Sequence, residues 1–162
     1  MLKKEDIPEV VEVLNDVIKE NRYLFMNNQI TDMEKELQWF ERGTKEGRLY
    51  LTVRIDGKLA GGASIHPQTD KHRHVASYGI FIGKNHRNLG LGTLLTQEFV
   101  EIAKKQELEI LQLSVYANNE RAYHVYEKCG FKEAGRLTKG IKFLDGTYTD
   151  EILMELLLKQ PK

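Results

Sequence analysis

Apolar residues recur at helical spacing in two stretches near the N-terminus. The first stretch follows Asp6, with Glu9 three residues later, and the second follows Thr31, with Glu34 three residues later. This spacing is typical of a capping box at the start of a helix. We therefore predict two helices. Their predicted ends are Asn21 for the first and Gly43 with Gly47 for the second.

Apolar and polar residues alternate from Leu49 to Ile55, which is the pattern of a strand with one buried face. Asp56-Gly57 is a strong two-residue turn signal, so the segment Leu59–Ile65 is predicted to return as an antiparallel partner. Further strands and helices alternate in the rest of the chain. The predicted strands are His74–Ile82, Ile110–Val115, Phe131–Leu137 and Tyr148–Leu158, and the predicted helices run from Gly92 to about Gln106 and from Asn118 or Asn119 to Gly130.

This order of elements predicts a single α+β domain over residues 1–162. We expect a mixed, mostly antiparallel sheet of about six or seven strands with about four helices and a central βαβ crossover. A ligand is expected where the sheet splits beside that crossover. The apolar segment Tyr23–Met26 lacks a clear period, and we expect it to be a loop that folds over part of the molecule.

A glycine-rich turn marks the crossover. The apolar run Ile80–Ile82 leads through a polar loop to Arg87-x-x-Gly90-x-Gly92, which opens directly into a helix. Strand, glycine turn and helix form an arrangement that binds phosphate, because the first N–H groups of a helix have no intrahelical acceptors. The motifs of dinucleotide and nucleotide-triphosphate sites are both missing. The loop alone therefore leaves open a simple turn that binds no ligand.

Composition narrows the classes of function. The 24 basic and 24 acidic side chains cancel, which gives no electrostatic case for nucleic acid or an anionic membrane as partner. The five histidines lie on different predicted elements, so no metal site is expected. A single cysteine, Cys129, and the lack of a long apolar run or a signal-peptide core predict a cytoplasmic protein without disulfides.

Two separate motifs resemble those of the GNAT family of acetyl-CoA-dependent N-acetyltransferases. The glycine turn matches the family's Gln/Arg-x-x-Gly-x-Gly/Ala element. The second motif matches the pattern Leu-x-Val, Asn-x-x-Ala, Tyr-x-x-x-Gly-Phe at Leu113-x-Val115, Asn119-x-x-Ala122 and Tyr126-x-x-x-Gly130-Phe131. The segment from Gly140 to Met154 is similar to the amino-acid and phosphinothricin-type branch of the family.

The resemblance implies a role for each matched position. Tyr126 would protonate the leaving thiolate, and a phenol is a credible acid for that task. Spacing alone favours a core aromatic at Tyr126, because it shares an apolar helix face with Ala122 and Cys129. The implied acetyl-CoA contacts are the pantetheine amides for Ile80, Phe81 and Ile82, the pantetheine arm for Asn119, and the pyrophosphate for the N–H groups of Asn88, Leu89, Gly90, Leu91, Gly92 and Thr93, with Arg87 at the loop entrance.

The sequence departs from the family at the catalytic base. Many members carry a glutamate early in the strand before the glycine turn, and here Ser77 takes that position, followed by Tyr78. Neither is a good base at neutral pH. The proton of the acceptor amine would pass to water, His74, His66 or Glu151, and His74 is the candidate because histidine titrates in the right range.

The leading hypothesis is direct transfer of acetyl from acetyl-CoA to a primary amine, in a complex that holds both substrates. A small molecule such as an amino acid is the expected acceptor. The alternatives are a protein N-terminal or lysine acetyltransferase and a non-catalytic acetyl-CoA-binding sensor. A homodimer is a further expectation. Family members usually begin with a strand, whereas only Met1–Lys4 precede the first helix here, so we expect that strand to be short or absent.

Overall fold

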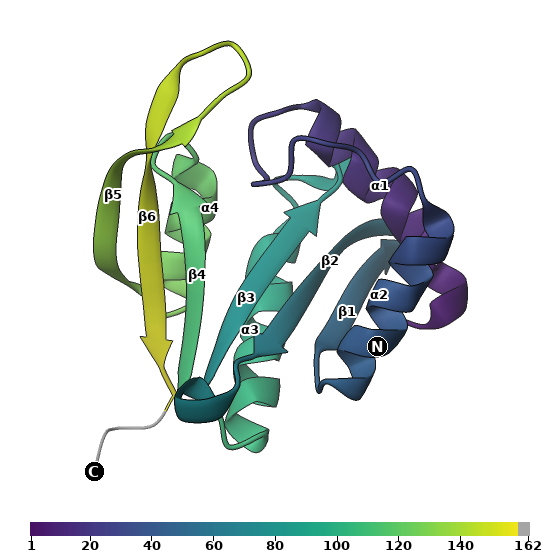
Figure 1. Cartoon of the computed structure of the whole chain (residues 1–162), viewed down its shortest axis with the longest axis horizontal. Coiled ribbons are helices and arrows are strands. Elements are labelled where there is room, and N and C mark those ends of the chain that lie inside the picture. Colours follow the sequence, from purple (N-terminus) through teal and green to yellow (C-terminus); the bar gives the residue numbers. More distant parts are fainter. Residues whose placement is uncertain (159–162) are drawn as a thin grey trace.

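The computed structural model describes residues 1–158, and its centre is a sheet with the strand order β1-β2-β3-β4-β6-β5 (Figure 1). All neighbouring strands are antiparallel except β3 and β4, which are parallel and joined by the crossover helix α3. This confirms the predicted α+β class. The strands are β1 (Leu49–Ile55), β2 (Lys58–Pro67), β3 (Val75–Ile82), β4 (Ile110–Tyr116), β5 (Lys132–Lys142) and β6 (Tyr148–Leu157), and the helices are α1 (Ile7–Lys19), α2 (Met33–Lys45), α3 (Leu91–Lys105) and α4 (Glu120–Lys128).

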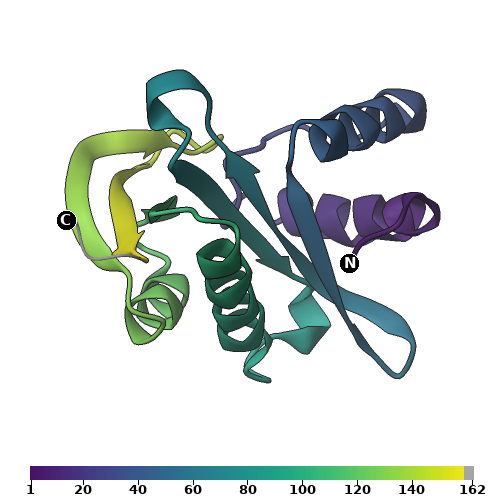
Figure 2. The same cartoon turned by 90° about the horizontal axis from the view of Figure 1, so that it is seen from below.

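Helices cover both faces of the sheet. Helices α1 and α2 lie on one face of the β1–β3 half, whereas α3 lies on the other, and α4 packs beside α3 against β4 (Figures 1 and 2). The main core fills the layer between the sheet and the α3/α4 pair, where Phe99, Leu111, Phe131 and Met154 are almost fully buried. A smaller apolar cluster holds α1 and α2 to β1. The larger of the two apolar clusters therefore lies on the α3/α4 face of the sheet.

The sheet splits between β3 and β4. Their parallel pairing covers only three residues of each strand, and it ends at Ser77 opposite Gln112. Beyond this point the two strands diverge, as Figure 1 shows. From Tyr78 onward, the edge of β3 that faces β4 has no strand partner within residues 1–158, although its other edge stays paired with β2. The split opens beside the crossover, where the order of elements predicts a ligand.

The start of α1 differs from the prediction. Asp6 does not cap the helix with its side chain; its carboxylate accepts from the Lys3 N–H at 3.0 Å and pairs with Arg54 at 2.9 Å. Glu9 does not fold back on the helix either, because it accepts from the N–H of Leu59 at 2.9 Å. The predicted capping box is therefore wrong. These two carboxylates instead hold α1 to the β1–β2 hairpin.

The boundaries of α2 also shift. Asp32, rather than Thr31, caps the helix by accepting from the N–H of Lys35 at 3.1 Å. Gly47 has a left-handed φ of 82° and follows the last turn, which agrees with the prediction. Gly43 lies buried inside the helix, so it does not end it.

The N-terminal segment forms no strand in the part of the chain that the structure describes. Its backbone link to the sheet is one hydrogen bond, from the N–H of Leu2 to the carbonyl of Tyr50 at 3.0 Å. This contact lies at the edge of β1 that has no strand partner within residues 1–158. Later strands match the prediction closely, except that β5 continues to Lys142, past the predicted end at Leu137.

Candidate functional site

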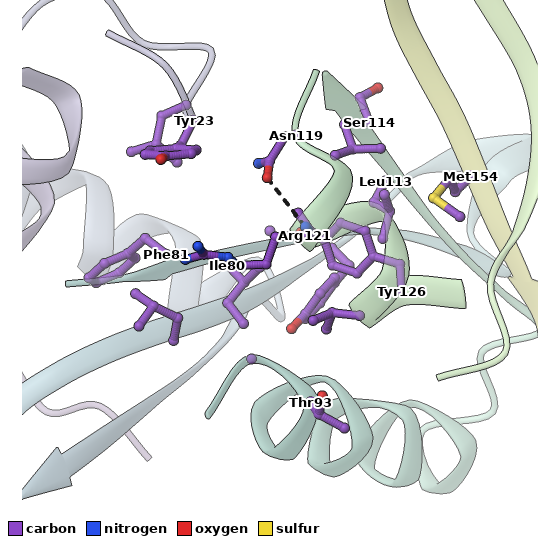
Figure 3. Close-up of a pocket in the computed structure, with 18 of the residues that line it drawn as sticks. Tyr23, Ile80, Phe81, Thr93, Leu113, Ser114, Asn119, Arg121, Tyr126 and Met154 are labelled. Atoms are coloured by element: carbon purple, nitrogen blue, oxygen red, sulfur yellow. Dashed lines mark hydrogen bonds between the residues drawn. The ribbon is translucent and has the colours of Figure 1, made fainter. Parts of the chain in front are cut away.

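A cavity of about 820 Å³ occupies the split between β3 and β4 (Figure 3). Both faces of β3 line it, since Tyr78 and Ile80 point toward the α3 layer and Ser77 and Gly79 toward the opposite layer. The cavity therefore passes through the plane of the sheet. Its lining includes the start of α3 and residues of α4 on one side, and the segment Tyr23–Phe25 between α1 and α2 on the other.

The glycine turn lies at the α3 side of this cavity. Gly90 adopts a left-handed conformation with a φ of 78° and immediately precedes α3. The first intrahelical hydrogen bond runs from the N–H of Leu94 to the carbonyl of Gly90 at 3.0 Å, so the N–H groups of residues 91–93 have no intrahelical acceptor. Of the predicted phosphate-binding segment, Asn88, Gly90, Leu91, Gly92 and Thr93 line the cavity, whereas the Leu89 side chain is exposed.

Arg87 lines the cavity, but its charge is already paired. Its guanidinium donates two hydrogen bonds to the carboxylate of Glu20, at 2.8 and 2.6 Å, and a third to the carbonyl of Ile82 at 3.1 Å. It also lies 4.5 Å from the centre of the Tyr23 ring. In this structure, Arg87 ties the glycine turn to the end of α1 and does not offer a free cation at the loop entrance.

Because Arg87 is paired with Glu20, we expect the stability of the folded protein to depend on pH. The hydrogen bond from Arg87 is the main cause that lowers the pKa of Glu20. A carboxyl group whose pKa is lowered in the folded state stabilises the protein above its unfolded pKa, about 4.3, and loses this effect as the pH falls through the folded pKa. Glu20→Gln is therefore expected to lower the free energy of unfolding by about 1–2 kcal/mol near neutral pH, and by much less near pH 3.

Urea unfolding of both proteins at the two pH values measures this difference. Glu101→Gln is the matched control, because Glu101 pairs with Lys104 on the exposed face of α3 and should change stability little. An equal loss for Glu20→Gln at both pH values would contradict the assigned role of the ion pair.

Tyr126 extends from α4 into the cavity wall and is 7% exposed. It packs against Phe131, with ring centres 5.9 Å apart, and its hydroxyl makes no hydrogen bond within residues 1–158. Burial raises the pKa of Tyr126 above the usual tyrosine value. The side chain thus belongs to the core, as its spacing indicates, and it also presents a protonated phenol to the cavity.

Asn119 caps α4 and lines the same cavity. Its side-chain oxygen accepts from the N–H of Ala122 at 3.3 Å, shown as the dashed line in Figure 3. This confirms Asn119 rather than Asn118 as the cap. The side-chain NH₂ group is left as a donor for a ligand.

The residues at the position of the family's glutamate differ in surroundings. Ser77 is exposed and lines the cavity. The Tyr78 hydroxyl lies 2.9 Å from the Thr96 hydroxyl, which itself donates to the carbonyl of Gly92 at 2.7 Å, so Tyr78 is the donor to Thr96. Burial also raises the pKa of Tyr78. Tyr78 supports the glycine turn and holds its proton.

His74 is not brought to this site. It precedes β3 at the closed end of the split, where its carbonyl accepts from the N–H groups of Glu109 and Ile110. Ser77 is the first residue of β3 that lines the cavity, and three residues of strand span roughly 10 Å. His66 and Glu151 are not part of the cavity lining either. We therefore do not propose His74, His66 or Glu151 as the base.

The segment after α1 forms a wall of the cavity. Tyr23, Leu24 and Phe25 line it, which agrees with the expected loop that folds over the molecule. The hydroxyl of Tyr116 donates to the carbonyl of Leu24 at 2.6 Å, and its ring lies 4.8 Å from that of Phe25. These two contacts with Tyr116 hold the segment Tyr23–Phe25 against β4.

Four further lining residues on β4, β6 and α4 carry polar groups that the sequence analysis did not single out. Alternation along the strands could have found the three strand residues, whereas no pattern in the sequence marks Arg121 on the first turn of α4. The four residues are Gln112, Ser114, Arg121 and Glu155.

Unpaired amides at a helix start, an open strand edge and a buried phenol share one cavity. This combination is suited to a long phosphate-bearing substrate with amide groups and to protonation of a leaving group. Within residues 1–158, no three His, Cys, Asp or Glu side chains gather as a metal site would require. No helix in that range has the length and apolar character needed to cross a membrane.

Comparison with known proteins gives the same class. The model of the acetyltransferase (GNAT) family matches residues 13–131. The L-amino acid N-acyltransferase MnaT of Escherichia coli (strain K12) is 24% identical over 161 residues, which cover 98% of this chain and 92% of that protein. The putative phosphinothricin acetyltransferase YwnH of Bacillus subtilis (strain 168) is 26% identical over 152 residues, which cover 93% of this chain and 92% of that protein.

The fold has close structural counterparts. The structure of yncA, a putative acetyltransferase from Salmonella typhimurium solved with its cofactor acetyl-CoA, superposes with a TM-score of 0.90 at 20% identity. The match covers 99% of this chain and 93% of the other. The chain belongs to the GNAT acetyltransferase family. At the level of the family, this confirms the predicted enzyme class, an N-acetyltransferase with acetyl-CoA as cosubstrate, and gives no support to a non-catalytic sensor.

Proposed function

We propose that this protein acetylates the primary amine of a small molecule, with an amino acid as the favoured class of acceptor, by direct transfer from acetyl-CoA. One observation carries the proposal: the cavity runs through the sheet split, with the glycine turn and Tyr126 on its α3/α4 side and an open polar face on the other. The two substrates would then meet at the split, each entering from its own side.

The α3/α4 side suits the cosubstrate. The free N–H groups at the start of α3 would bind the diphosphate, because an anion is stabilised at a helix N-terminus. The open edge of β3 over Ile80–Ile82 would pair with the pantetheine amides, and Asn119 would donate to the same arm. Arg121 lines the cavity and has no ion-pair partner within residues 1–158, so it offers the positive charge that Arg87 spends on Glu20.

The reaction needs no acyl-enzyme. The amine nitrogen attacks the thioester carbonyl, a C–N bond forms, and the C–S bond breaks to leave a thiolate. Tyr126 would protonate that thiolate, because its raised pKa keeps the phenol protonated until a strong base appears beside it. The raised pKa also means that Tyr126 would not take the proton from the amine.

The opposite side suits a small acceptor. The segment Tyr23–Phe25 closes over it, and Tyr116 anchors this wall to β4. The names of two relatives, an L-amino acid N-acyltransferase and a putative phosphinothricin acetyltransferase, support an amino-acid-type acceptor.

A thiol-release assay with acetyl-CoA tests the proposal. The panel holds the common L-amino acids, phosphinothricin, aliphatic diamines and short peptides with free N-termini. Release with one or more amino acids is the expected result. Release with peptides alone would favour the protein acetyltransferase alternative, and no release with any amine would contradict the proposed function. The cytoplasmic location and the homodimer stay predictions, and size-exclusion chromatography tests the second.

A further inference from the structure

A row of polar side chains crosses the sheet at the floor of the split. The strand register places His66 beside Ser77, Ser77 beside Gln112, and Gln112 beside Glu155. The neighbours of these residues along each strand, such as Ile65, Leu111 and Met154, are buried in the α3/α4 core. Because side chains alternate along a strand, the polar row faces the other side of the sheet, from which the acceptor would enter.

Glu155 is the one carboxylate among the residues that line the cavity. Within residues 1–158, it makes no ion pair within 4.0 Å and no side-chain hydrogen bond. The charged residue opposite it in register is Lys132 on β5, and its neighbour on β4 is the neutral Gln112. A half-buried carboxylate without a partner is unfavourable for the folded state, and such groups are typical of binding sites.

We infer that Glu155 binds the ammonium group of the acceptor and accepts its proton, an inference that rests on the proposed acetyl transfer. Its position explains how the site can work with a serine at the usual glutamate position. Ser77 and Glu155 belong to the same row, two strands apart, which places their Cα atoms roughly 10 Å from each other. In this protein the row carries its carboxylate on β6 rather than on β3, and that carboxylate lines the cavity.

The protons balance in this scheme. The ammonium group gives its first proton to Glu155, which later releases it to solvent. After attack, the C–S bond breaks and Tyr126 gives its proton to the sulfur. The second proton of the nitrogen returns to Tyr126 through solvent. The sum is an acetylated amine, a free thiol and one proton released for each ammonium group consumed.

Glu155→Gln tests the inference, with Glu151→Gln as the matched control. The two glutamates lie on the same face of β6, and Glu151 does not line the cavity. For the best amine of the thiol-release panel, Glu155→Gln is expected to lower kcat/KM by roughly 100-fold or more. The Kd for acetyl-CoA, measured by calorimetry, should stay within about twofold of the wild-type value. Glu151→Gln should match the wild type.

The pH profile separates proton transfer from a structural effect. Without Glu155, the enzyme depends on amine that has already lost its proton, so raising the pH toward about 10 should recover much of the lost kcat/KM. Glu155→Asp keeps the carboxylate and should retain more activity than Glu155→Gln. A merely structural role would give a loss that does not depend on pH.

Three further outcomes would contradict either the role of Glu155 or the proposed function. Glu155→Gln with kcat/KM within about threefold of the wild type would overturn the inference and leave the proposed function intact. A loss equal for both glutamate variants would also overturn it. Wild-type protein that binds acetyl-CoA but turns over no amine would overturn the proposed function, and the inference with it.

Discussion

Tyr126→Phe is expected to lower kcat by about 100-fold or more and to leave the Kd for acetyl-CoA within about twofold. The substitution removes only the hydroxyl, which makes no hydrogen bond within residues 1–158, so the packing against Phe131 is kept. The proton for the thiolate is then missing, and the C–S bond breaks more slowly. Steady-state kinetics with the best amine and calorimetry with acetyl-CoA measure the two quantities.

Tyr123→Phe is the control for this experiment. Tyr123 lies on α4, three residues before Tyr126, but it does not line the cavity. The Tyr123→Phe variant should therefore have the same kcat as the wild-type protein. Undiminished turnover in Tyr126→Phe would show that another group, or water, protonates the thiolate.

Gly90→Ala is expected to weaken acetyl-CoA binding by roughly tenfold. Gly90 has a φ of 78°, and a side chain there costs about 1–2 kcal/mol, although no atom lies within 4 Å of the added Cβ. The backbone relieves this strain by turning, and the N–H groups at the start of α3 then point away from the diphosphate. Calorimetric titration with acetyl-CoA gives the change in Kd.

Gly57→Ala separates loss of binding from loss of stability. Gly57 has a φ of 79° in the β1–β2 hairpin, also with nothing near its Cβ, and it does not line the cavity. Both variants should therefore lose similar stability, whereas only Gly90→Ala should lose affinity. Equal affinity in the two variants would contradict binding of the diphosphate at the start of α3.

Most of the fold follows from local patterns. The two-residue alternation of β1 and the Asp56-Gly57 turn act over a few residues, so they can be recognised without knowing what packs against them. The same holds for the glycine turn before α3. The order of these elements then restricts the topology, because a parallel pair needs a crossover. This is why the position of the split was predictable.

Contacts between distant residues were not predictable in this way. Asp6 has the right type and position for a cap, but Arg54, which lies on β1, takes its carboxylate. Arg87 has the right position for a phosphate contact, but Glu20 at the end of α1 neutralises it. In both cases, the residue matches its local sequence pattern, but a partner far away in the sequence binds its charged group instead.

The position of the candidate base was not predictable for a related reason. His74 has suitable chemistry, yet the short pairing of β3 with β4 leaves it at the closed end of the split. Glu155 was not a candidate from the sequence, because the sequence does not show how far β3 and β4 pair. Only the register reveals that Glu155 shares a row with Ser77.

A crystal structure of the complex with acetyl-CoA tests the central claim most directly. We expect diphosphate oxygens about 2.7–3.2 Å from the backbone nitrogens of residues 88–93, the pantetheine in the split along β3, and the thioester sulfur beside the Tyr126 hydroxyl. The acetyl group should point toward the polar row that ends at Glu155. Acetyl-CoA bound elsewhere, or with its diphosphate away from the start of α3, would contradict this account.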